Sequence, residues 1–401
     1  MRDMKNISIW VIVILMCVPI VLDIAGLKHP HPLKGEKTET SFPIFTLESL
    51  NQGDYTNRIN EYLKTNFTLR GMAIRTRNQI DYSIFYQTHA RSVIVGKEGY
   101  LFEENYIKSA LGLDDFDQEN FEYIASNLEE ISDSTGVPIF IVLAPGKASY
   151  YTEFIPEEYF NADTIVPNRT YEKWKTRVLD SDNLKLVDLK AQLDPLDGLF
   201  PKNGIHWCEW SQVDAFNILN NSLASNLPLD KKPLNFVVDS TYRSDQMEGT
   251  DQDIELGLNL WQDLADLETK YYKVSYEQND STSKPKVLLV GDSYAWGVVN
   301  RGVLRHSYDE GEFWYYNQVV HGPKYLGKDD FGKHPFEVHG IENRSDFYET
   351  VKKFDAVILL STDANLHKFP FGFGPYTNGD LIMTTSILDE LAISFNPFPF
   401  Q

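Results

Sequence analysis

Residues 286–297 read KVLLVGDSYAWG, and the fold class follows from this stretch. Residues 287–290 are a continuous apolar run closed by Gly291, which is typical of a strand buried on both faces of a parallel sheet. Asp292 and Ser293 stand in the turn that leaves this strand. We therefore expect a central strand with polar side chains at its carboxyl end.

Ser293 is placed where a nucleophile could act. Residues 295–306 can continue as a helix, whose N-terminal N–H groups would point back at Ser293 and could hold a developing oxyanion. The alternative is structural, because Asp and Ser are favoured cap residues and Gly-Asp-Ser could simply turn the chain. The glycine-flanked nucleophile elbow is absent. The tripeptide alone leaves both interpretations open.

Strands and helices alternate from about residue 117 onward. Further strands are expected at residues 138–143, 184–189, 312–316 and 356–360, and helices at residues 117–135, 171–179, 211–226, 346–353 and 380–395. Residues 227–251 are rich in Pro, Asp and Ser and are expected to form a long connection. A Ser-x-x-Asp capping pattern is expected to open the helix at residue 211. The alternation predicts a mostly parallel α/β sandwich.

The N-terminal part predicts a membrane anchor. Residues 7–27 are almost wholly apolar, and as a helix they would span ~30 Å, close to the hydrocarbon thickness of a bilayer. Arg2 and Lys5 before them predict a cytoplasmic N-terminus and an exported remainder, so we expect a single-pass membrane protein with its chemistry on the extracytoplasmic side. A cleaved signal peptide is the alternative.

The rest of the chain is expected to form one catalytic domain behind a stalk. The expected boundaries are an anchor at residues 1–27, a proline-stiffened stalk at 28–52 and a catalytic domain at 53–401. The domain opens with apolar residues at helical spacing over residues 53–87, which predicts an amphipathic helical arm. Residues 92–102 then place two β-rich runs about a glycine-containing turn, as a hairpin requires.

The composition excludes some functions. A net charge of −21 over 401 residues argues against nucleic acid as a partner, because phosphate backbones are bound by clustered Lys and Arg. Cys17 lies in the apolar N-terminal segment and Cys208 far from it, so no intramolecular disulfide framework is expected. We expect neither a metal nor a cofactor.

His206 is the best candidate among nine histidines for a base that activates Ser293. It lies in a Gly-Ile-His-Trp turn just before an expected helix, and a loop position lets the imidazole reach the edge of the sheet. Trp207 can fix the plane of the imidazole by packing. Lys147 also follows a buried strand and therefore also lies at a carboxyl end. Spacing alone does not show that His206 and Ser293 touch.

Four motifs in this order resemble the SGNH-hydrolase-like DHHW family, which includes the alginate O-acetyltransferases of the bacterial envelope. They are residues 93–102, the Pro-x-Lys element at 145–147, Gly-Ile-His-Trp at 204–207 and Gly-Asp-Ser-Tyr at 291–294. The resemblance covers roughly residues 45–370. Each motif is weak by itself, but the ordered set is fairly specific.

The resemblance implies a fold and an activity. The fold is a flavodoxin-like SGNH three-layer sandwich, circularly permuted because the histidine motif precedes the serine. The activity is acetyl transfer through an acetyl-serine onto an exported polysaccharide, with a multi-spanning membrane acyltransferase as the partner that delivers the acetyl group. Backbone N–H groups at Ser293 and the side chain of Asn317 are candidates for the oxyanion, and Lys147 for oxyanion or substrate.

The chain departs from the family pattern at one position. The family's Asp-x-His-Trp places an acid two residues before the histidine, whereas this chain has Gly204 there. Asn203 could orient the imidazole instead, or an acid could come from elsewhere, with Asp363 and Glu209 as candidates. Three functions therefore stay open: an O-acetyltransferase, which we favour; a carbohydrate acetylesterase; and a non-catalytic polysaccharide-binding or assembly protein.

Overall fold

The computed structural model describes most of the chain from residue 41 to residue 375. The described residues are Trp10, Val18, Val21, Leu22, Leu33, Lys34 and 41–375, without 67–68, 115, 163, 195–197, 265–267, 279–281, 310 and 322–345. Most of the expected membrane anchor and all of the helix expected at residues 380–395 lie outside them. None of the helices within the described residues combines the length and apolar character needed to cross a bilayer.

The chain divides into two compact units. The arm unit comprises residues 1–91, 255–263 and 384–401, and the sheet unit comprises residues 92–254 and 264–383. The arm unit contains the helices α2 (Leu47–Asn51), α3 (Asp54–Asn66) and α4 (Arg70–Phe85). Within it, the side chain of Asn78 on α4 donates to the carbonyl oxygen of Leu258 at 2.7 Å, and that of Arg75 to Leu260 at 2.6 Å.

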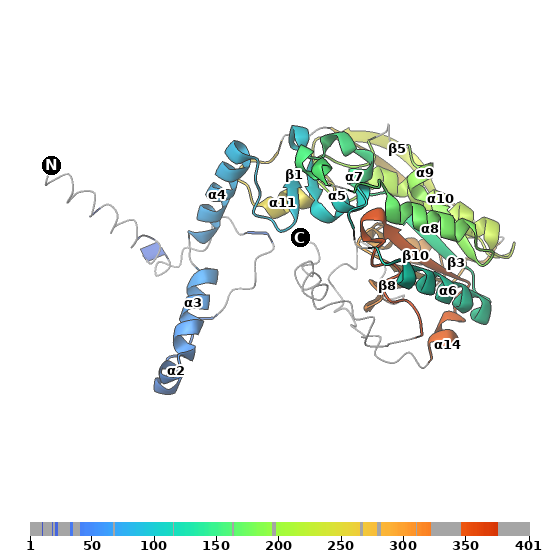
Figure 1. The fold of residues 1–401 in the computed structure, drawn as a ribbon, viewed down its shortest axis with the longest axis horizontal. Coiled ribbons are helices and arrows are strands. Elements are labelled where there is room, and N and C mark those ends of the chain that lie inside the picture. Colours follow the sequence, from blue (N-terminus) through green and yellow to red (C-terminus); the bar gives the residue numbers. More distant parts are fainter. Residues whose placement is uncertain are drawn as a thin grey trace. The chain divides into compact units, whose positions relative to one another are not determined.

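A six-stranded sheet forms the centre of the sheet unit (Figure 1). In spatial order its strands are β4 (Leu184–Asp188), β3 (Ile139–Ala144), β10 (Ala356–Thr362), β7 (Val287–Gly291), β8 (Glu312–Tyr315) and β9 (Val319–His321). The first five run parallel, and β9 is antiparallel to β8. The sheet is therefore mixed but mostly parallel, which confirms the expected α/β class.

Helices surround this sheet. They are α5 (Glu104–Ala110), α6 (Gln118–Thr135), α7 (Lys147–Tyr150), α8 (Arg169–Leu179), α9 (Leu189–Gln192), α10 (Glu209–Asn226), α12 (Ala295–Asn300), α13 (Val303–His306) and α14 (Phe347–Val351). One further helix, α11 (Asp253–Leu258), is divided between the two units. Short 3-10 helices lie at η1 (Lys97–Gly99), η2 (Thr152–Phe154), η3 (Glu157–Asn161) and η5 (Asp363–Asn365). The N-terminal end of α11 belongs to the sheet unit and the rest to the arm unit.

The core lies on both faces of the sheet. Alternate residues of β3, among them Ile139 and Ile141, join one apolar cluster with Leu128 of α6 and Trp174 of α8. Phe140, which points to the opposite face, is equally buried. Because both faces are covered, the central strands have the continuous apolar runs that identified them in the sequence.

Two hairpins complete the sheet unit. The strands β1 (Val93–Val95) and β2 (Leu101–Glu103) pair antiparallel, which confirms the hairpin expected at residues 92–102. The strands β5 (Phe236–Ser244) and β6 (Thr269–Tyr276) form a second antiparallel pair. The expectation of a connection without strands at residues 227–251 is therefore wrong. Most of β5 is exposed, so polar side chains interrupt its β-rich pattern.

Two helix boundaries also differ from expectation. The helix expected over residues 295–306 is broken into α12 and α13 at Gly302, whose φ of 74° is left-handed. The helix expected to begin at the Ser-x-x-Asp pattern begins earlier, at Glu209. Ser211 therefore lies inside the first turn, where its hydroxyl donates to the carbonyl oxygen of Cys208 instead of capping the helix.

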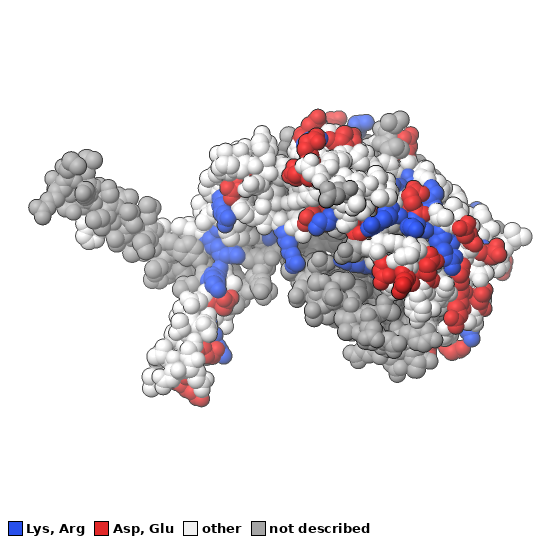
Figure 2. Space-filling model, in the orientation of Figure 1, with Lys and Arg blue, Asp and Glu red and all other residues white. Residues whose placement is uncertain are grey.

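Ion pairs join segments that are distant in sequence. Figure 2 shows basic side chains interspersed with acidic ones on the face in view. Arg177 on α8 binds Glu129 on α6 through two nitrogens, at 2.7 and 2.8 Å. This bidentate geometry fixes α8 against α6 more firmly than a single exposed pair would.

Candidate active site

Ser293 follows β7 at the carboxyl edge of the sheet. All five residues of β7 are buried, and Ser293 is partly exposed in the turn between β7 and α12. Gly291 lets this turn pass close to β10, because a Cβ there would lie 3.0 Å from the carbonyl oxygen of Leu360 and 2.9 Å from Ala295. The serine hydroxyl is thus presented by a rigid strand end.

Asp292 fixes the serine turn by hydrogen bonds of its side chain. One carboxylate oxygen accepts from the N–H of Tyr294 at 3.0 Å. The other accepts from the N–H of Thr362 at 2.9 Å and from the side chain of Asn365 at 3.0 Å. Burial raises the pKa of Asp292, whereas these three hydrogen bonds favour its charged form. Asp292 therefore bonds the Ser293 turn to the end of β10.

His206 lies within hydrogen-bonding distance of Ser293. The distance between Nε2 of His206 and Oγ of Ser293 is 2.9 Å, which confirms the pairing expected from the sequence. Tyr294, next to the serine, donates its hydroxyl to the carbonyl oxygen of Ile205 at 2.9 Å. Its ring centroid lies 5.0 Å from that of His206 and 5.1 Å from that of Trp207. Contacts of Tyr294 therefore join the serine turn to the histidine loop.

Asp253, the first residue of α11, faces the other side of the imidazole. Its Oδ2 makes a very short contact with Nδ1 of His206. Its Oδ1 accepts from the N–H groups of Ile205 at 2.9 Å and Ile254 at 2.8 Å. With a carboxylate on Nδ1, the imidazole carries its proton there and offers Nε2 as an acceptor to Ser293.

The carboxylate of Asp253 also affects the pKa of His206. Burial by itself lowers the pKa of His206, but the negative charge of Asp253 and its hydrogen bond outweigh that effect. The pKa of His206 is therefore raised above its usual value. An imidazolium formed by taking a proton from Ser293 would be stabilised in the same way.

Asp253 was not predicted from the sequence. It stands at the beginning of a helix, where Asp is common as a capping residue, and 47 residues separate it from His206. No periodicity relates residues at such a separation. The one signal in the sequence is an acid two residues after the stretch interpreted as a long connection.

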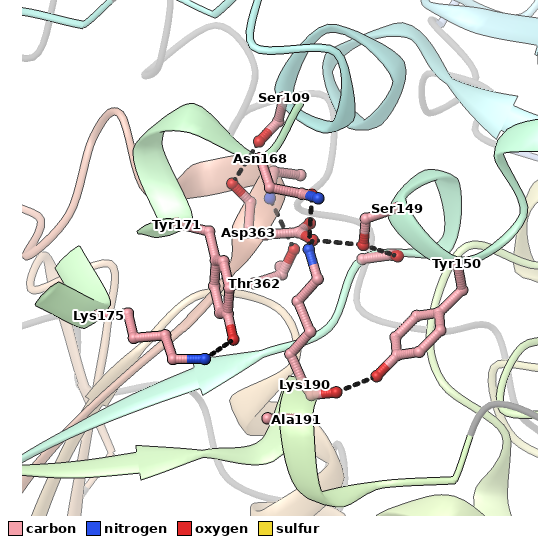
Figure 3. A network of polar contacts seen from close by, with 12 residues as sticks. Ser109, Ser149, Tyr150, Asn168, Tyr171, Lys175, Lys190, Ala191, Thr362 and Asp363 are labelled. Atoms are coloured by element: carbon pink, nitrogen blue, oxygen red, sulfur yellow. Dashed lines mark hydrogen bonds and ion pairs between the residues drawn. The ribbon is translucent and has the colours of Figure 1, made fainter. Parts of the chain in front are cut away.

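The residues proposed to orient the imidazole do not do so. Asn203 is buried, and both polar atoms of its amide lack a hydrogen-bond partner within the described residues. Glu209 instead binds Arg301 at 2.5 Å. Asp363 binds Lys190 at 2.9 Å and accepts from Ser149 at 2.6 Å, as Figure 3 shows. The predictions for Asn203, Glu209 and Asp363 are wrong because Asp253 occupies the position beside Nδ1.

Lys147 and Asn317 have structural contacts. The ammonium of Lys147 is fully buried and donates to three backbone carbonyl oxygens, those of Leu101, Lys202 and Gly204. Burial lowers the pKa of Lys147 to about 7, an effect that the charge of Asp253 partly offsets. Since an ammonium has three hydrogens, none is left for a substrate, so that role predicted for Lys147 is wrong.

Asn317 follows β8 and is buried. Its side-chain amide donates to the carbonyl oxygen of Phe371 at 3.1 Å. No hydrogen bond joins it to Ser293 or His206 in the described part of the chain, and its role at an oxyanion stays a prediction. Within the same residues, no three His, Cys, Asp or Glu side chains gather in a way that could hold a metal.

Comparisons with known proteins point to one family. A family model described as an SGNH hydrolase-like domain of the acetyltransferase AlgX matches residues 93–307, which is more than half of the chain. The matched region contains Ser293, His206 and Asp253. No curated protein sequence matches the chain.

Several solved structures are similar to this chain. The O-acetyltransferase domain of Pseudomonas putida AlgJ is 17% identical, with a TM-score of 0.43 over 76% of this chain and 97% of that chain. Pseudomonas aeruginosa AlgX is 13% identical, with a TM-score of 0.40 over 73% of this chain and 70% of that chain. A DHHW family protein from Eubacterium siraeum is 14% identical, with a TM-score of 0.36 over 61% of this chain and 87% of that chain.

The extent of the family match decides the assignment, because it spans the serine turn, the histidine loop and the acid between them. The chain belongs to the family of SGNH hydrolase-like acetyltransferase domains represented by AlgX.

Proposed function

We propose that this protein is a serine-dependent O-acetyltransferase that moves an acetyl group through an acetyl-serine at Ser293 onto a hydroxyl of an exported cell-envelope polysaccharide. One observation carries the proposal: a continuous series of polar contacts runs from Asp253 through His206 to Ser293. The family membership supports acetyl transfer as the reaction class.

In the first half of the reaction, Ser293 becomes acetylated. Nε2 of His206 takes the proton of the serine hydroxyl as Oγ attacks the carbonyl carbon of an acetyl ester or thioester. Asp253 stabilises the resulting imidazolium without itself taking the proton. The tetrahedral intermediate then collapses, the bond to the donor's oxygen or sulfur breaks, and His206 returns the proton to this leaving group.

The backbone at Ser293 is the candidate oxyanion donor. The next three N–H groups bond inside the turn: Tyr294 to the Asp292 side chain, Ala295 to the Asp292 carbonyl oxygen, and Trp296 to the Ser293 carbonyl oxygen. Within the described residues, the N–H of Ser293 has no such acceptor. A donor fixed beside the nucleophile costs little reorganisation when charge develops on the carbonyl oxygen.

In the second half, a sugar hydroxyl takes the place of the donor. His206 removes its proton, the hydroxyl oxygen attacks the acetyl-serine, and Oγ of Ser293 leaves and regains a proton from His206. Water in place of the sugar would make the same site an esterase. Acceptor binding and exclusion of water therefore separate a transferase from a hydrolase.

The test compares transfer with hydrolysis. The protein is given a small activated acetyl ester with and without soluble oligosaccharides, and acetylated sugar and free acetate are both measured. We expect acetylated sugar to form only with acceptor and to disappear in Ser293→Ala. Acetate release that acceptor never diverts would make the protein an acetylesterase. No acyl transfer and no labelling of Ser293 by an acyl probe would make it a binding or assembly protein.

We further propose that residues 7–27 anchor the protein in the cell membrane, with Ser293 on the extracytoplasmic side. Acetyl-CoA is made in the cytoplasm and is too polar to cross a bilayer, so a multi-spanning membrane acyltransferase is the partner that would deliver the acetyl group. Tethering would act by raising the effective concentration of Ser293 near the point of delivery.

This part is tested with a chain that starts at Ser41 and is exported by a cleavable signal. It should keep activity toward a small acetyl ester, whereas glycan acetylation in cells should fall sharply. Native levels of glycan acetylation by this chain, in cells that lack every such membrane acyltransferase, would show that no such partner is needed.

A further inference from the structure

Lys147 is the buried charged group that the proposed reaction leaves without a chemical role. It is the first residue of α7, directly after β3, and its side chain is 0% exposed. No carboxylate lies within ion-pair distance of it in the described part of the chain. A lone ammonium buried in this way is costly unless all its hydrogens are bound.

The three acceptors of Lys147 meet that requirement. The distances from Nζ are 2.7 Å to the carbonyl oxygen of Leu101, and 2.8 Å to each of those of Lys202 and Gly204. The rings of Phe102 and Tyr100 lie 5.4 and 5.6 Å from the same nitrogen, within the range of a cation–π contact. The charge is therefore held by carbonyl dipoles and aromatic rings.

Two of these carbonyls belong to the loop that carries the base. Lys202 and Gly204 lie four and two residues before His206. The N–H of Leu101 on β2 donates to the carbonyl oxygen of Lys202 at 3.1 Å, so β2 and Lys147 hold the same point of the loop. The next residue of the loop, Ile205, is fixed by hydrogen bonds to the side chains of Asp253 and Tyr294.

The sheet connects Lys147 with Ser293. Lys147 follows β3, Ser293 follows β7, and both strands pair with β10 in parallel register. We propose that Lys147 is a positioning residue, which sets the approach of His206 to Ser293 by binding the carbonyls of Lys202 and Gly204 and which touches neither donor nor acceptor. The effect on turnover rests on the function proposed above, whereas the placement of His206 does not.

The test replaces Lys147 by Met, which keeps an unbranched side chain one atom shorter and removes the three donors. We expect kcat toward a small activated acetyl ester to fall ~10²-fold with little change in KM, because a displacement of about 1 Å in catalytic groups has that effect. The matched control is Lys190→Met at the same sheet edge, where the lysine binds Asp363. It should lower the melting temperature and leave kcat unchanged.

A second readout does not depend on activity. The low-field NMR signal of the His206 Nδ1 proton, assigned by its loss in Asp253→Asn, should shift or broaden in Lys147→Met and persist in Lys190→Met. Lys147→Gln, which keeps two donors, should lie between wild type and Met and replaces Lys147→Met if that variant does not fold.

A folded Lys147→Met or Lys147→Gln protein with the wild-type His206 signal would overturn the proposal. So would a rise in KM at unchanged kcat, which would make Lys147 a substrate contact. If the wild-type protein transfers no acyl group while Lys147→Met still moves the His206 signal, the proposed function fails and the positioning role stands.

Discussion

The ends of β7 and β10 carry two polar clusters that differ in what their acids face. Beyond β7, Asp253 contacts the imidazole of His206, which contacts the partly exposed hydroxyl of Ser293. Beyond β10, the carboxylate of Asp363 is enclosed by Lys190 and Ser149 (Figure 3). Both clusters lie at one edge of one sheet, yet only the first ends in a group that a substrate could reach.

The difference shows that a position near the carboxyl end of a strand does not by itself give an acid a catalytic role. A buried carboxylate that already has a lysine as its ion-pair partner gains little from an imidazole, and this ion pair would have to break to accept one. Asp253 has one oxygen bound to backbone N–H groups and the other facing His206. The partners of each acid therefore decide between a catalytic and a structural role.

Removing the nucleophile or the base should have the largest effect. We expect Ser293→Ala and His206→Ala each to lower acyl transfer by ~10⁴-fold or more while the protein stays folded, since the two residues act as one unit. Transfer from a small acetyl ester and circular dichroism measure the two properties. A folded variant with near-native turnover would remove that residue from the mechanism.

Asp253→Asn should have the next largest effect on turnover. The amide cannot balance an imidazolium and favours the wrong tautomer, so kcat should fall by on the order of 10²–10⁴-fold with Ser293 still in place. Steady-state kinetics at the plateau of the pH profile measure this loss. Unchanged kcat would mean that Asp253 is a loop anchor and that another group orients His206.

The pH dependence of activity should also depend on Asp253. Catalysis needs neutral His206, and Asp253 raises its pKa, so activity should be lost as the pH falls through a value above the usual pKa of histidine. Without the charge of Asp253, burial dominates and lowers the pKa, so the acid limb of Asp253→Asn should move to lower pH. The pH dependence of kcat/KM tests this, and a limb that stays in place would contradict the assignment.

Asp363→Asn should separate stability from catalysis. It removes the charge from a largely buried ion pair with Lys190, and breaking such a pair typically costs about 3–5 kcal/mol of unfolding free energy. Denaturant unfolding should show the loss, whereas kcat at a temperature where the variant is folded should match wild type. A fall in kcat with unchanged stability would instead make Asp363 part of the catalytic site.

The sequence predicted the central strands and named Ser293 and His206 as candidates, for physical reasons. A strand buried on both faces needs an uninterrupted apolar run, so β3, β7 and β10 are visible in composition, and their carboxyl ends mark one edge of the sheet. The helix expected over residues 117–135 is α6, which ends at Thr135 because Gly136 adopts the left-handed conformation that glycine favours.

The acid that contacts His206 and the β5–β6 hairpin could not be predicted from local sequence patterns. Asp253 reaches His206 through tertiary contacts alone, and in the sequence it is one of many acids near a helix start. β5 is largely exposed, and its pairing with β6 depends on a partner that is distant in the chain. Lys147 and Asp363 also have their hydrogen-bond and ion-pair partners at positions distant in the sequence, which spacing does not reveal.

Glu209→Gln should have the smallest effect of all. Glu209 was the remaining candidate acid near His206 in the sequence, but its carboxylate binds Arg301, and the backbone carbonyl of Glu209 accepts from the same guanidinium. Gln keeps the shape and one acceptor, so unfolding free energy should change by about 1 kcal/mol or less. The kcat value and the acid limb of the pH profile should both match wild type, in contrast to Asp253→Asn. If Glu209→Gln instead moved the acid limb as far as Asp253→Asn does, the charge that governs His206 would be shared between the two acids, and the assignment of Asp253 as the sole orienting carboxylate would fail.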